Sequence, residues 1–213
     1  VVRITADEAG WRLSQLPAAQ AALVSLDATD GASRALVGGL DFSFSKFNRI
    51  AQARRQPGSN IKPFIYAAAM EHGFTPASVI NDAPIVFHDP GLEKVWRPEN
   101  DSGKFYGPTS LRTALVNSRN LVSIRLLQQL GVGKAVDYLT RLGFERADLS
   151  PNLSLALGTP SLTPLSLVSA YAILANGGYK VQPYLVGEVH RVGGELVART
   201  EPRRACPDCT GAG

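Results

Sequence analysis

A serine and a lysine lie one helical turn apart where the sequence changes from a turn to a helix. Ser59 and Lys62 occur in "PGSNIKPFIYAAAM", in which proline and glycine are typical of a turn and the following residues of a helix over about 59–72. Side chains three apart on a helix share a face. A serine hydroxyl is a poor nucleophile until a neighbouring base takes its proton, so this pair could act as nucleophile and base.

Lys62 can serve as a base only when its amine is neutral. Its apolar neighbours, such as Ile61 and Phe64, are expected to bury it, and burial lowers the pKa of a lysine. Free N–H groups at the helix start would also favour negative charge developing there. The alternative is that Ser59 only caps the helix and Lys62 extends to solvent, and the pair alone does not decide between these interpretations.

A second polar group stands at "NSRN", where a break between two predicted helices would let side chains project from a turn. Ser118 and Asn120 are two residues apart, so a hydroxyl and a carboxamide could face one cleft. The hydroxyl could pass a proton between the lysine and a leaving amine, and the carboxamide could hold a peptide backbone. Capping of the second helix is the alternative. Arg119, between them, either contacts substrate or faces water.

The elements that would position these residues alternate between strands and helices. A hairpin is predicted within 21–39 and another within 184–199, where apolar runs flank glycine-containing turns. Helices are predicted at about 59–72, 109–117, 121–131, 134–143 and 163–176, the last with Thr163 as its N-cap. Residues 75–107 form a long loop-rich segment, and Trp96 within it either lines a substrate cleft or packs under the loop. This order indicates the α+β class.

Composition narrows the possible functions. The chain has 213 residues, of which 45% are hydrophobic and 19% charged, and a net charge of +4 with scattered basic residues. It shows no basic block typical of nucleic-acid binding and no apolar stretch long enough to cross a membrane. No signal peptide is recognisable and the only methionine is Met70, so we expect an excerpt from a longer protein.

No metal or cofactor site is predicted. Cys206 and Cys209 form the only C-x-x-C pair, which supplies at most two metal ligands, and the three histidines are far apart in the sequence. A local disulfide or a disordered tail over 206–213 is the favoured interpretation.

Ser-x-x-Lys followed by Ser-x-Asn is the first part of the signature of penicillin-recognising serine enzymes. Longer stretches, including "RRQPGSNIKPFIYAAAMEHG", "VINDAPIVF", "WRPENDSGKFYGPTSLRTALVNSRNLVSIRLLQQLG" and "LSLALGTPSLTPLSLVSAYAILANGGYKVQPYLV", closely resemble the transpeptidase domain of class A penicillin-binding proteins of the 1A type. The resemblance covers roughly residues 11–200. It implies the serine β-lactamase and penicillin-binding-protein transpeptidase fold, an antiparallel sheet with a helical subdomain.

The resemblance also implies a function, peptidoglycan D,D-transpeptidation, and a role for each motif residue. Ser59 would be acylated by a stem peptide or a β-lactam, Lys62 would take its proton, and Ser118 would help protonate the leaving group. Asn120 would orient the peptide, with Arg119 and Trp96 as further candidate substrate contacts. No cofactor is implied.

One family motif is missing from the sequence. The motif Lys-Thr/Ser-Gly does not occur, and Cys209-Thr210-Gly211 is interpreted as resembling it only by chance. We therefore expect the end of an accessory region over 1–18, an N-terminal part of the transpeptidase domain over 19–205, incomplete on its C-terminal side, and a tail over 206–213. An inactive binding module, or a D,D-carboxypeptidase or β-lactamase on the same fold, remains an alternative.

The resemblance further implies the setting of the longer protein. That protein would be anchored in the bacterial inner membrane, face the periplasm, and carry a glycosyltransferase domain. Its partners would be peptidoglycan stem peptides and β-lactams, with other cell-wall synthesis proteins as candidate partners and no nucleic acid.

Overall fold

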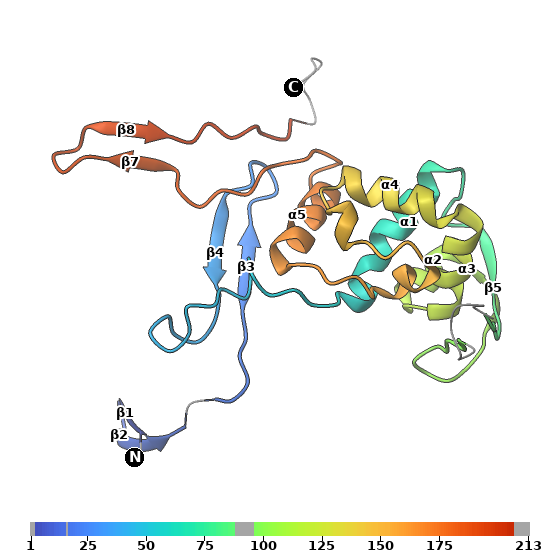
Figure 1. The fold of residues 1–213 in the computed structure, drawn as a ribbon, viewed down its shortest axis with the longest axis horizontal. Helices are drawn as coiled ribbons and strands as arrows, with labels where there is room; N and C mark the ends of the chain where they lie inside the picture. The colour runs from blue at the N-terminus through green and yellow to red at the C-terminus, as the bar shows by residue number, and fades with distance from the viewer. Residues whose placement is uncertain (1–2, 16, 88–95, 207–213) are drawn as a thin grey trace.

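The computed structural model describes residues 3–15, 17–87 and 96–206. Figure 1 shows a body of helices from which β-hairpins extend to one side. The helices are α1 (Lys62–Glu71), α2 (Leu111–Val116), α3 (Asn120–Leu130), α4 (Val132–Arg141) and α5 (Pro164–Ala175), with 3₁₀ turns η1 (Gly58–Ile61), η2 (Arg146–Asp148) and η3 (Leu153–Leu157). The strands are β1 (Arg3–Asp7), β2 (Gly10–Ser14), β3 (Leu23–Leu26), β4 (Ser33–Val37), β5 (Val79–Asp82), β6 (Gly107–Ser110), β7 (Glu188–His190) and β8 (Leu196–Arg199).

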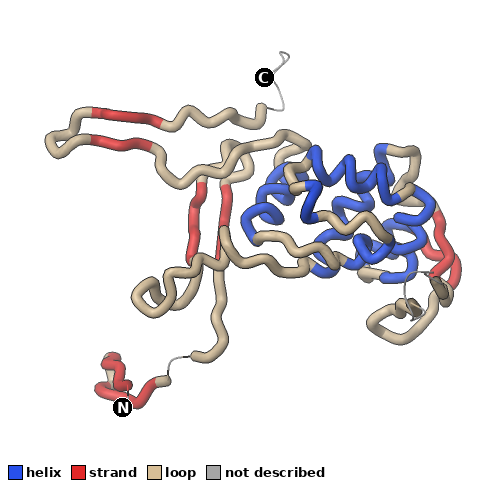
Figure 2. The backbone as a smooth tube through the Cα atoms, viewed as in Figure 1, coloured by secondary structure: helices blue, strands red, loops and turns tan. Residues whose placement is uncertain are grey.

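The strands of the described residues form separate antiparallel pairs, β1 with β2, β3 with β4, β5 with β6 and β7 with β8 (Figure 2). The β3–β4 and β7–β8 pairs confirm the two predicted hairpins. The β1–β2 pair was not predicted, and its side chains are largely exposed, as Trp11 is at 74%. Helices combined with antiparallel strands confirm the α+β class.

The β5–β6 pair adds two strands, which were not predicted, to the loop-rich segment expected over 75–107. Val79 pairs with Ser110 and Asp82 with Gly107, so the two ends of this segment join as strands. Because residues 107–110 belong to a strand, the helix expected from about residue 109 begins at Leu111. The pairing joins residues that are far apart in the sequence, which local patterns do not reveal.

The hydrophobic core lies around α1, which packs against α3 and α4. Phe64, Ile65 and Ala68 of α1 have no exposed surface, and neither have Leu126 and Leu127 of α3. Alanines along α1 let the neighbouring helices approach closely, and phenylalanine fills the space between them. Phe64 meets Phe144 and Tyr171 edge to face, with ring centroids 5.6 and 4.9 Å apart.

Two of the predicted helices differ in how their N-terminal ends are capped. Thr163 caps α5 as predicted, because its hydroxyl accepts a hydrogen bond from the Ser166 N–H at 3.1 Å. The helix predicted over 59–72 is a 3₁₀ turn, η1, followed by α1, and neither has a side-chain cap. Ser59 is therefore not a helix cap, and its hydroxyl is left for another role.

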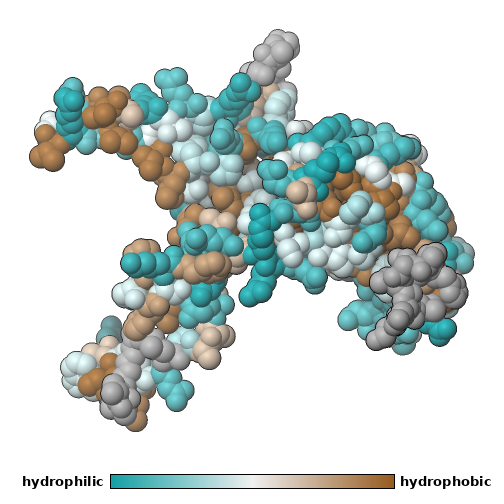
Figure 3. Space-filling view, in the orientation of Figure 1, coloured by the Kyte–Doolittle hydropathy of each residue, from teal (hydrophilic) through white to brown (hydrophobic). Residues whose placement is uncertain are grey.

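Apolar side chains gather on the projecting hairpins, seen in brown over β7 and β8 in Figure 3. In the described part of the chain, no helix is both long and apolar enough to cross a membrane. Within the same residues, no group of three or more His, Cys, Asp or Glu side chains could hold a metal ion. Cys206 is disulfide-bonded, while Cys209 lies outside the described residues together with Thr210 and Gly211.

We predict that Phe64→Ala destabilises the chain by about 3–5 kcal/mol, because it removes a ring that is fully buried between two other rings and leaves a cavity. Chemical denaturation measures this change. Phe42→Ala is the matched control, since Phe42 is 72% exposed, and we expect it to change the free energy of unfolding by less than about 0.5 kcal/mol. Equal effects of the two substitutions would contradict the described core.

Candidate active site

The turn that carries Ser59 is fixed by contacts from distant parts of the chain. Gly58, with φ +57°, donates its N–H to the Gly158 carbonyl at 3.3 Å. Arg55 and Leu162 exchange two backbone hydrogen bonds of 2.9 and 3.0 Å. The Tyr171 hydroxyl donates to the Asn60 carbonyl at 2.9 Å. These contacts hold Ser59 at the N-terminal end of the η1–α1 helix, where backbone N–H groups have no partner within the helix.

Lys62 is the most deeply buried cation of the site, with 1% of its surface exposed. Its amine lies 2.7 Å from the Ser118 carbonyl, 3.0 Å from the Ser118 hydroxyl and 2.7 Å from Asn120 Oδ1. Burial lowers the pKa of Lys62 from its ordinary 10.5 to about 8, because a charged amine is disfavoured away from water. The buried lysine does not extend to solvent, and about one-tenth of its amine is neutral at pH 7.

Ser118 lies in the turn between α2 and α3 with a left-handed backbone. Among the described residues it is the only one other than glycine with positive φ, at +52°. Hydrogen bonds from the N–H groups of Ser118 and Arg119 to the Leu115 and Ala114 carbonyls, 3.0 and 2.8 Å long, hold the turn. Such a backbone costs a serine roughly 1–2 kcal/mol. The turn directs both the carbonyl and the hydroxyl of Ser118 to Lys62.

Asn120, the first residue of α3, has both ends of its carboxamide bound. Oδ1 accepts a hydrogen bond from Lys62, and Nδ2 donates to the Glu99 carbonyl at 2.9 Å. Its backbone N–H donates to Asn100 Oδ1 at 2.9 Å. An amide nitrogen carries two hydrogens, so one remains for a ligand. Asn120 thus links Lys62 to the loop before β6.

A cavity of about 420 Å³ brings the Ser59 turn and the Ser118–Asn120 segment together. It is lined by Ser59, Asn100, Asp101, Ser102, Asn117, Ser118, Arg119 and Asn120. Within the described residues no hydrogen bond joins the Ser59 hydroxyl to Lys62 or Ser118. Catalytic hydrogen bonds are often longer before substrate binds, so Ser59 and Lys62, one helical turn apart, need not be hydrogen-bonded here to act as nucleophile and base.

The contacts of Lys62 suit both of its protonation states. A charged amine donates three hydrogen bonds, one to each of its three oxygen partners. A neutral amine has two N–H groups and one lone pair. Of its partners only the Ser118 hydroxyl can reverse its role and donate to that lone pair. The geometry therefore lets a proton pass between Lys62 and Ser118 without moving either residue.

Arg119 and Trp96, the two further predicted contacts, lie in different surroundings. Arg119 lines the cavity, and its guanidinium carbon lies 3.3 Å from the centroid of the Tyr106 ring, while its Nε lies 4.0 Å from the Asp82 carboxylate. Trp96 stacks on Phe87 with ring centroids 5.3 Å apart and packs against the hydrophobic core. It is not among the residues that line the cavity, and its contact with substrate stays a prediction.

Sequence reasoning missed Asn100 and Gly158. Asn100 stands in "RPENDSGK", where asparagine is ordinary for a loop, and Gly158 follows a short apolar run. Each acts on residues far away in the sequence, so no local pattern marks either. The only available signal was the length of the 75–107 segment, which suggested a functional loop.

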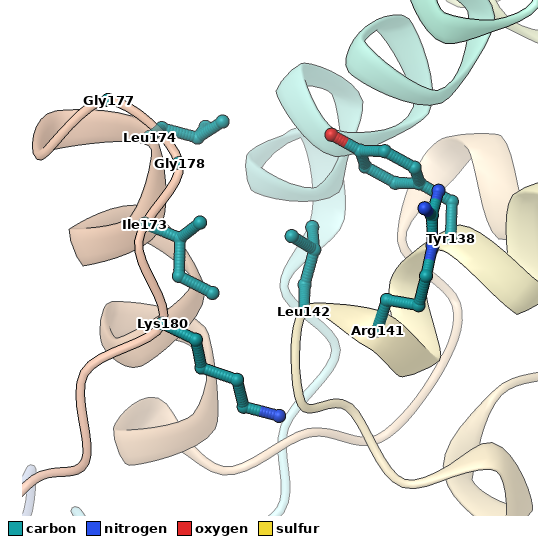
Figure 4. Close-up of a pocket in the computed structure, with 8 residues that line it drawn as sticks. All are labelled: Tyr138, Arg141, Leu142, Ile173, Leu174, Gly177, Gly178 and Lys180. Atoms are coloured by element: carbon teal, nitrogen blue, oxygen red, sulfur yellow. The ribbon is translucent and has the colours of Figure 1, made fainter. Parts of the chain in front are cut away.

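A separate cavity of about 440 Å³ lies between α4 and the end of α5 (Figure 4). Its lining includes Tyr138, Arg141, Ile173 and Lys180, and Figure 4 shows these side chains facing one another across it. None of the predicted site residues lines it. The chemistry suggested by the sequence therefore belongs to the cavity beside Ser59.

Comparison with known proteins identifies the family of this chain. The family model described as the penicillin-binding protein transpeptidase domain matches residues 21–205. The chain belongs to this family of transpeptidase domains.

Individual relatives place it close to one branch of that family. It is 53% identical to penicillin-binding protein 1A of Pseudomonas aeruginosa over 95% of the chain and 25% of that protein. It is 44% identical to penicillin-binding protein 1A of Escherichia coli over 93% of the chain and 23% of that protein. The chain thus spans about a quarter of the length of the curated relatives it matches.

Solved structures confirm the predicted fold. The crystal structure of penicillin-binding protein 1A from Haemophilus influenzae superposes with a TM-score of 0.92 at 42% identity, covering 99% of the chain and 31% of that structure. PonA1 from Mycobacterium tuberculosis in complex with penicillin V gives a TM-score of 0.72 at 28% identity, over 85% of the chain and 51% of that structure. The fold is that of penicillin-binding-protein transpeptidase domains.

Gly158→Ala tests how the Ser59 turn is held. An added Cβ at Gly158 would lie 2.0 Å from the Gly58 carbonyl oxygen, and its φ of +73° strains any other residue. We expect the substitution to destabilise the chain by more than about 1 kcal/mol, measured by chemical denaturation. Gly133→Ala in α4 is the control, since no atom lies within 4 Å of its added Cβ and alanine favours a helix. A stabilising Gly158→Ala would contradict the close contact.

Proposed function

We propose that the protein to which this chain belongs is a peptidoglycan D,D-transpeptidase that acts through an acyl-enzyme on Ser59. The observation that carries the proposal is the buried Lys62 amine, hydrogen-bonded to Ser118 and Asn120 beside the cavity that Ser59 lines. The family match and the 53% identity to a penicillin-binding protein 1A support the same conclusion.

In the proposed first step, Ser59 Oγ attacks the carbonyl carbon between the two terminal D-alanines of a stem peptide. The hydroxyl proton passes to the neutral Lys62 amine, and the Oγ–C bond forms as the C–N bond breaks. The leaving nitrogen takes a proton that Lys62 returns through the Ser118 hydroxyl. The Ser59 N–H at the start of η1 is one donor to the developing oxyanion.

In the second step an amino group of a neighbouring stem peptide attacks the acyl carbon and a new C–N bond forms as the Oγ–C bond breaks. The attacking nitrogen gives up one proton, and Ser59 Oγ takes up a proton to regain its hydroxyl. The free hydrogen of Asn120 Nδ2 would bind a peptide carbonyl. Arg119 and Trp96 are proposed as further substrate contacts, Arg119 from the cavity wall. A β-lactam would acylate the same serine by opening its ring, so no leaving group departs.

The setting of the whole protein is also a proposal, since the matched relatives are about four times as long as this chain. We propose a protein anchored in the inner membrane with this domain in the periplasm and a glycosyltransferase domain elsewhere in its chain. Stem peptides and β-lactams are its proposed partners, with other cell-wall synthesis proteins as candidates. The domain division at residues 18 and 205 belongs to the same proposal.

The rate of acylation should depend on the neutral fraction of Lys62. With a pKa of about 8, roughly one-tenth of the amine is neutral at pH 7 and most of it at pH 9. We expect the acylation rate constant to rise about tenfold between pH 7 and pH 9 and then level off. It is measured by quenching the reaction with a penicillin at different times and determining the acylated protein on a gel or by mass spectrometry. A flat profile over this range would contradict Lys62 as the base.

Intact mass after incubation with a penicillin tests the proposed nucleophile. We expect an adduct of one penicillin mass on the protein and none on Ser59→Ala. Ser102→Ala is the matched control, because Ser102 lines the same cavity but has no contact with Lys62, and it should keep the adduct.

The outcomes separate the competing functions. A long-lived adduct supports transfer, whereas an adduct that is released within minutes favours hydrolysis on the same fold. An adduct that survives Ser59→Ala would overturn the assignment of the nucleophile. Running the same assay on this chain and on the longer protein shows whether these 213 residues suffice for acylation.

A further inference from the structure

Asn100 makes an unusually complete set of contacts beside the site. The residue is 5% exposed. Its Oδ1 accepts hydrogen bonds from the Asn120 and Leu121 N–H groups at 2.9 and 3.3 Å. Its Nδ2 donates to both Asp82 oxygens at 2.8 and 3.0 Å and to the Lys104 carbonyl at 2.9 Å. Every polar group of this side chain is bound within the protein.

The first of these contacts supplies a cap that α3 does not have locally. Arg119, the residue before α3, makes no side-chain hydrogen bond to the helix start. The first N–H groups of a helix need acceptors from outside the helix. Here Asn100 provides the acceptor from a loop twenty residues earlier in the sequence. The loop before β6 therefore helps to position the start of α3, together with the hydrogen bonds of the α2–α3 turn.

The second contact anchors Asn100 to a buried charge. Asp82 has no exposed surface and lies at the end of β5, in the pair that closes this loop. Its carboxylate receives two hydrogen bonds from Asn100 and has the Arg119 guanidinium at 4.0 Å. A buried carboxylate needs such donors, so the orientation of the Asn100 carboxamide is fixed with nitrogen toward Asp82 and oxygen toward α3.

The start of α3 is also where Asn120 binds Lys62. The Asn120 N–H donates a hydrogen bond to Asn100 Oδ1 at 2.9 Å, while Asn120 Oδ1 accepts one from the Lys62 amine at 2.7 Å. A shift of the helix start would therefore move one of the three oxygens around Lys62. We infer that Asn100 is a positioning residue for acylation. Its hydrogen bonds to buried Asp82 and to the Asn120 N–H fix the position of Asn120, and Asn120 Oδ1 in turn holds the Lys62 amine. The inference rests on the proposed function.

Acylation kinetics on the longer protein that carries this chain test the inference. A labelled penicillin gives two separate quantities, the rate constant of acylation and the fraction of molecules acylated at the end. We expect Asn100→Ala to lower the rate constant about 10- to 100-fold, because a displacement of the order of 1 Å near a reacting group has effects of this size. The final acylated fraction should stay close to that of the unmodified protein.

Thr163→Ala is the matched control. It removes another helix cap, on α5, without touching Lys62 or Asn120, and its acylation rate constant should be unchanged. Asn100→Ser serves if the alanine variant does not fold, because the shorter serine side chain has one polar atom in place of the two with which the carboxamide reaches Asp82 and α3. The serine variant is expected to lower the rate constant in the same direction.

Two results would overturn the inference. One is a rate constant within twofold of the unmodified protein in both Asn100 variants. The other is a lower acylated fraction with an unchanged rate constant, which is the result of a purely structural role. Failure of the unmodified protein to form an adduct would instead overturn the proposed function, so the two failures are distinguishable.

Discussion

The burial of a single lysine amine is the constraint on which the site depends. Lys62 starts α1, whose next turns form the centre of the core, so its amine is carried inside with them. A buried amine needs oxygen partners, and those of Lys62 come from outside α1. Ser118 and Asn120 supply them from the α2–α3 turn. The burial of α1 in the core therefore brings two motif residues, Ser118 and Asn120, around the amine of a third, Lys62.

The two walls of the cavity are held by different means. The Ser59 wall depends on backbone approach, since Gly58 and Gly158 allow two loops to meet without side chains between them. The opposite wall depends on a chain of side chains that runs from buried Asp82 through Asn100 to α3. Backbone contacts thus hold the turn that carries Ser59, and side-chain contacts hold Asn120, a hydrogen-bond partner of Lys62. Rigid support on both sides suits chemistry that requires a hydroxyl and an amine to meet across a small gap.

The sequence was informative where a local pattern has one physical meaning. Thr163 followed by proline predicted the start of α5, and Ser59 with Lys62 identified the pair beside the cavity. It was uninformative where partners are distant. The β5–β6 pairing and the Asn100 contacts join residues about twenty or more apart, and nothing in a loop of polar residues marks which one will be buried. For Trp96 the sequence could not decide between two positions, because an aromatic residue in a loop suits a substrate cleft and a hydrophobic core equally.

The left-handed backbone of Ser118 has a consequence for how this protein can change. A glycine there would adopt φ +52° without strain. It would also lack the hydroxyl that can exchange a proton with Lys62. Backbone strain therefore favours glycine at this position, whereas the hydrogen bond to buried Lys62 and the proposed proton exchange favour serine. A variant library screened for thermal resistance alone would report the balance of strain and hydrogen bonding here, and nothing about the proposed acylation.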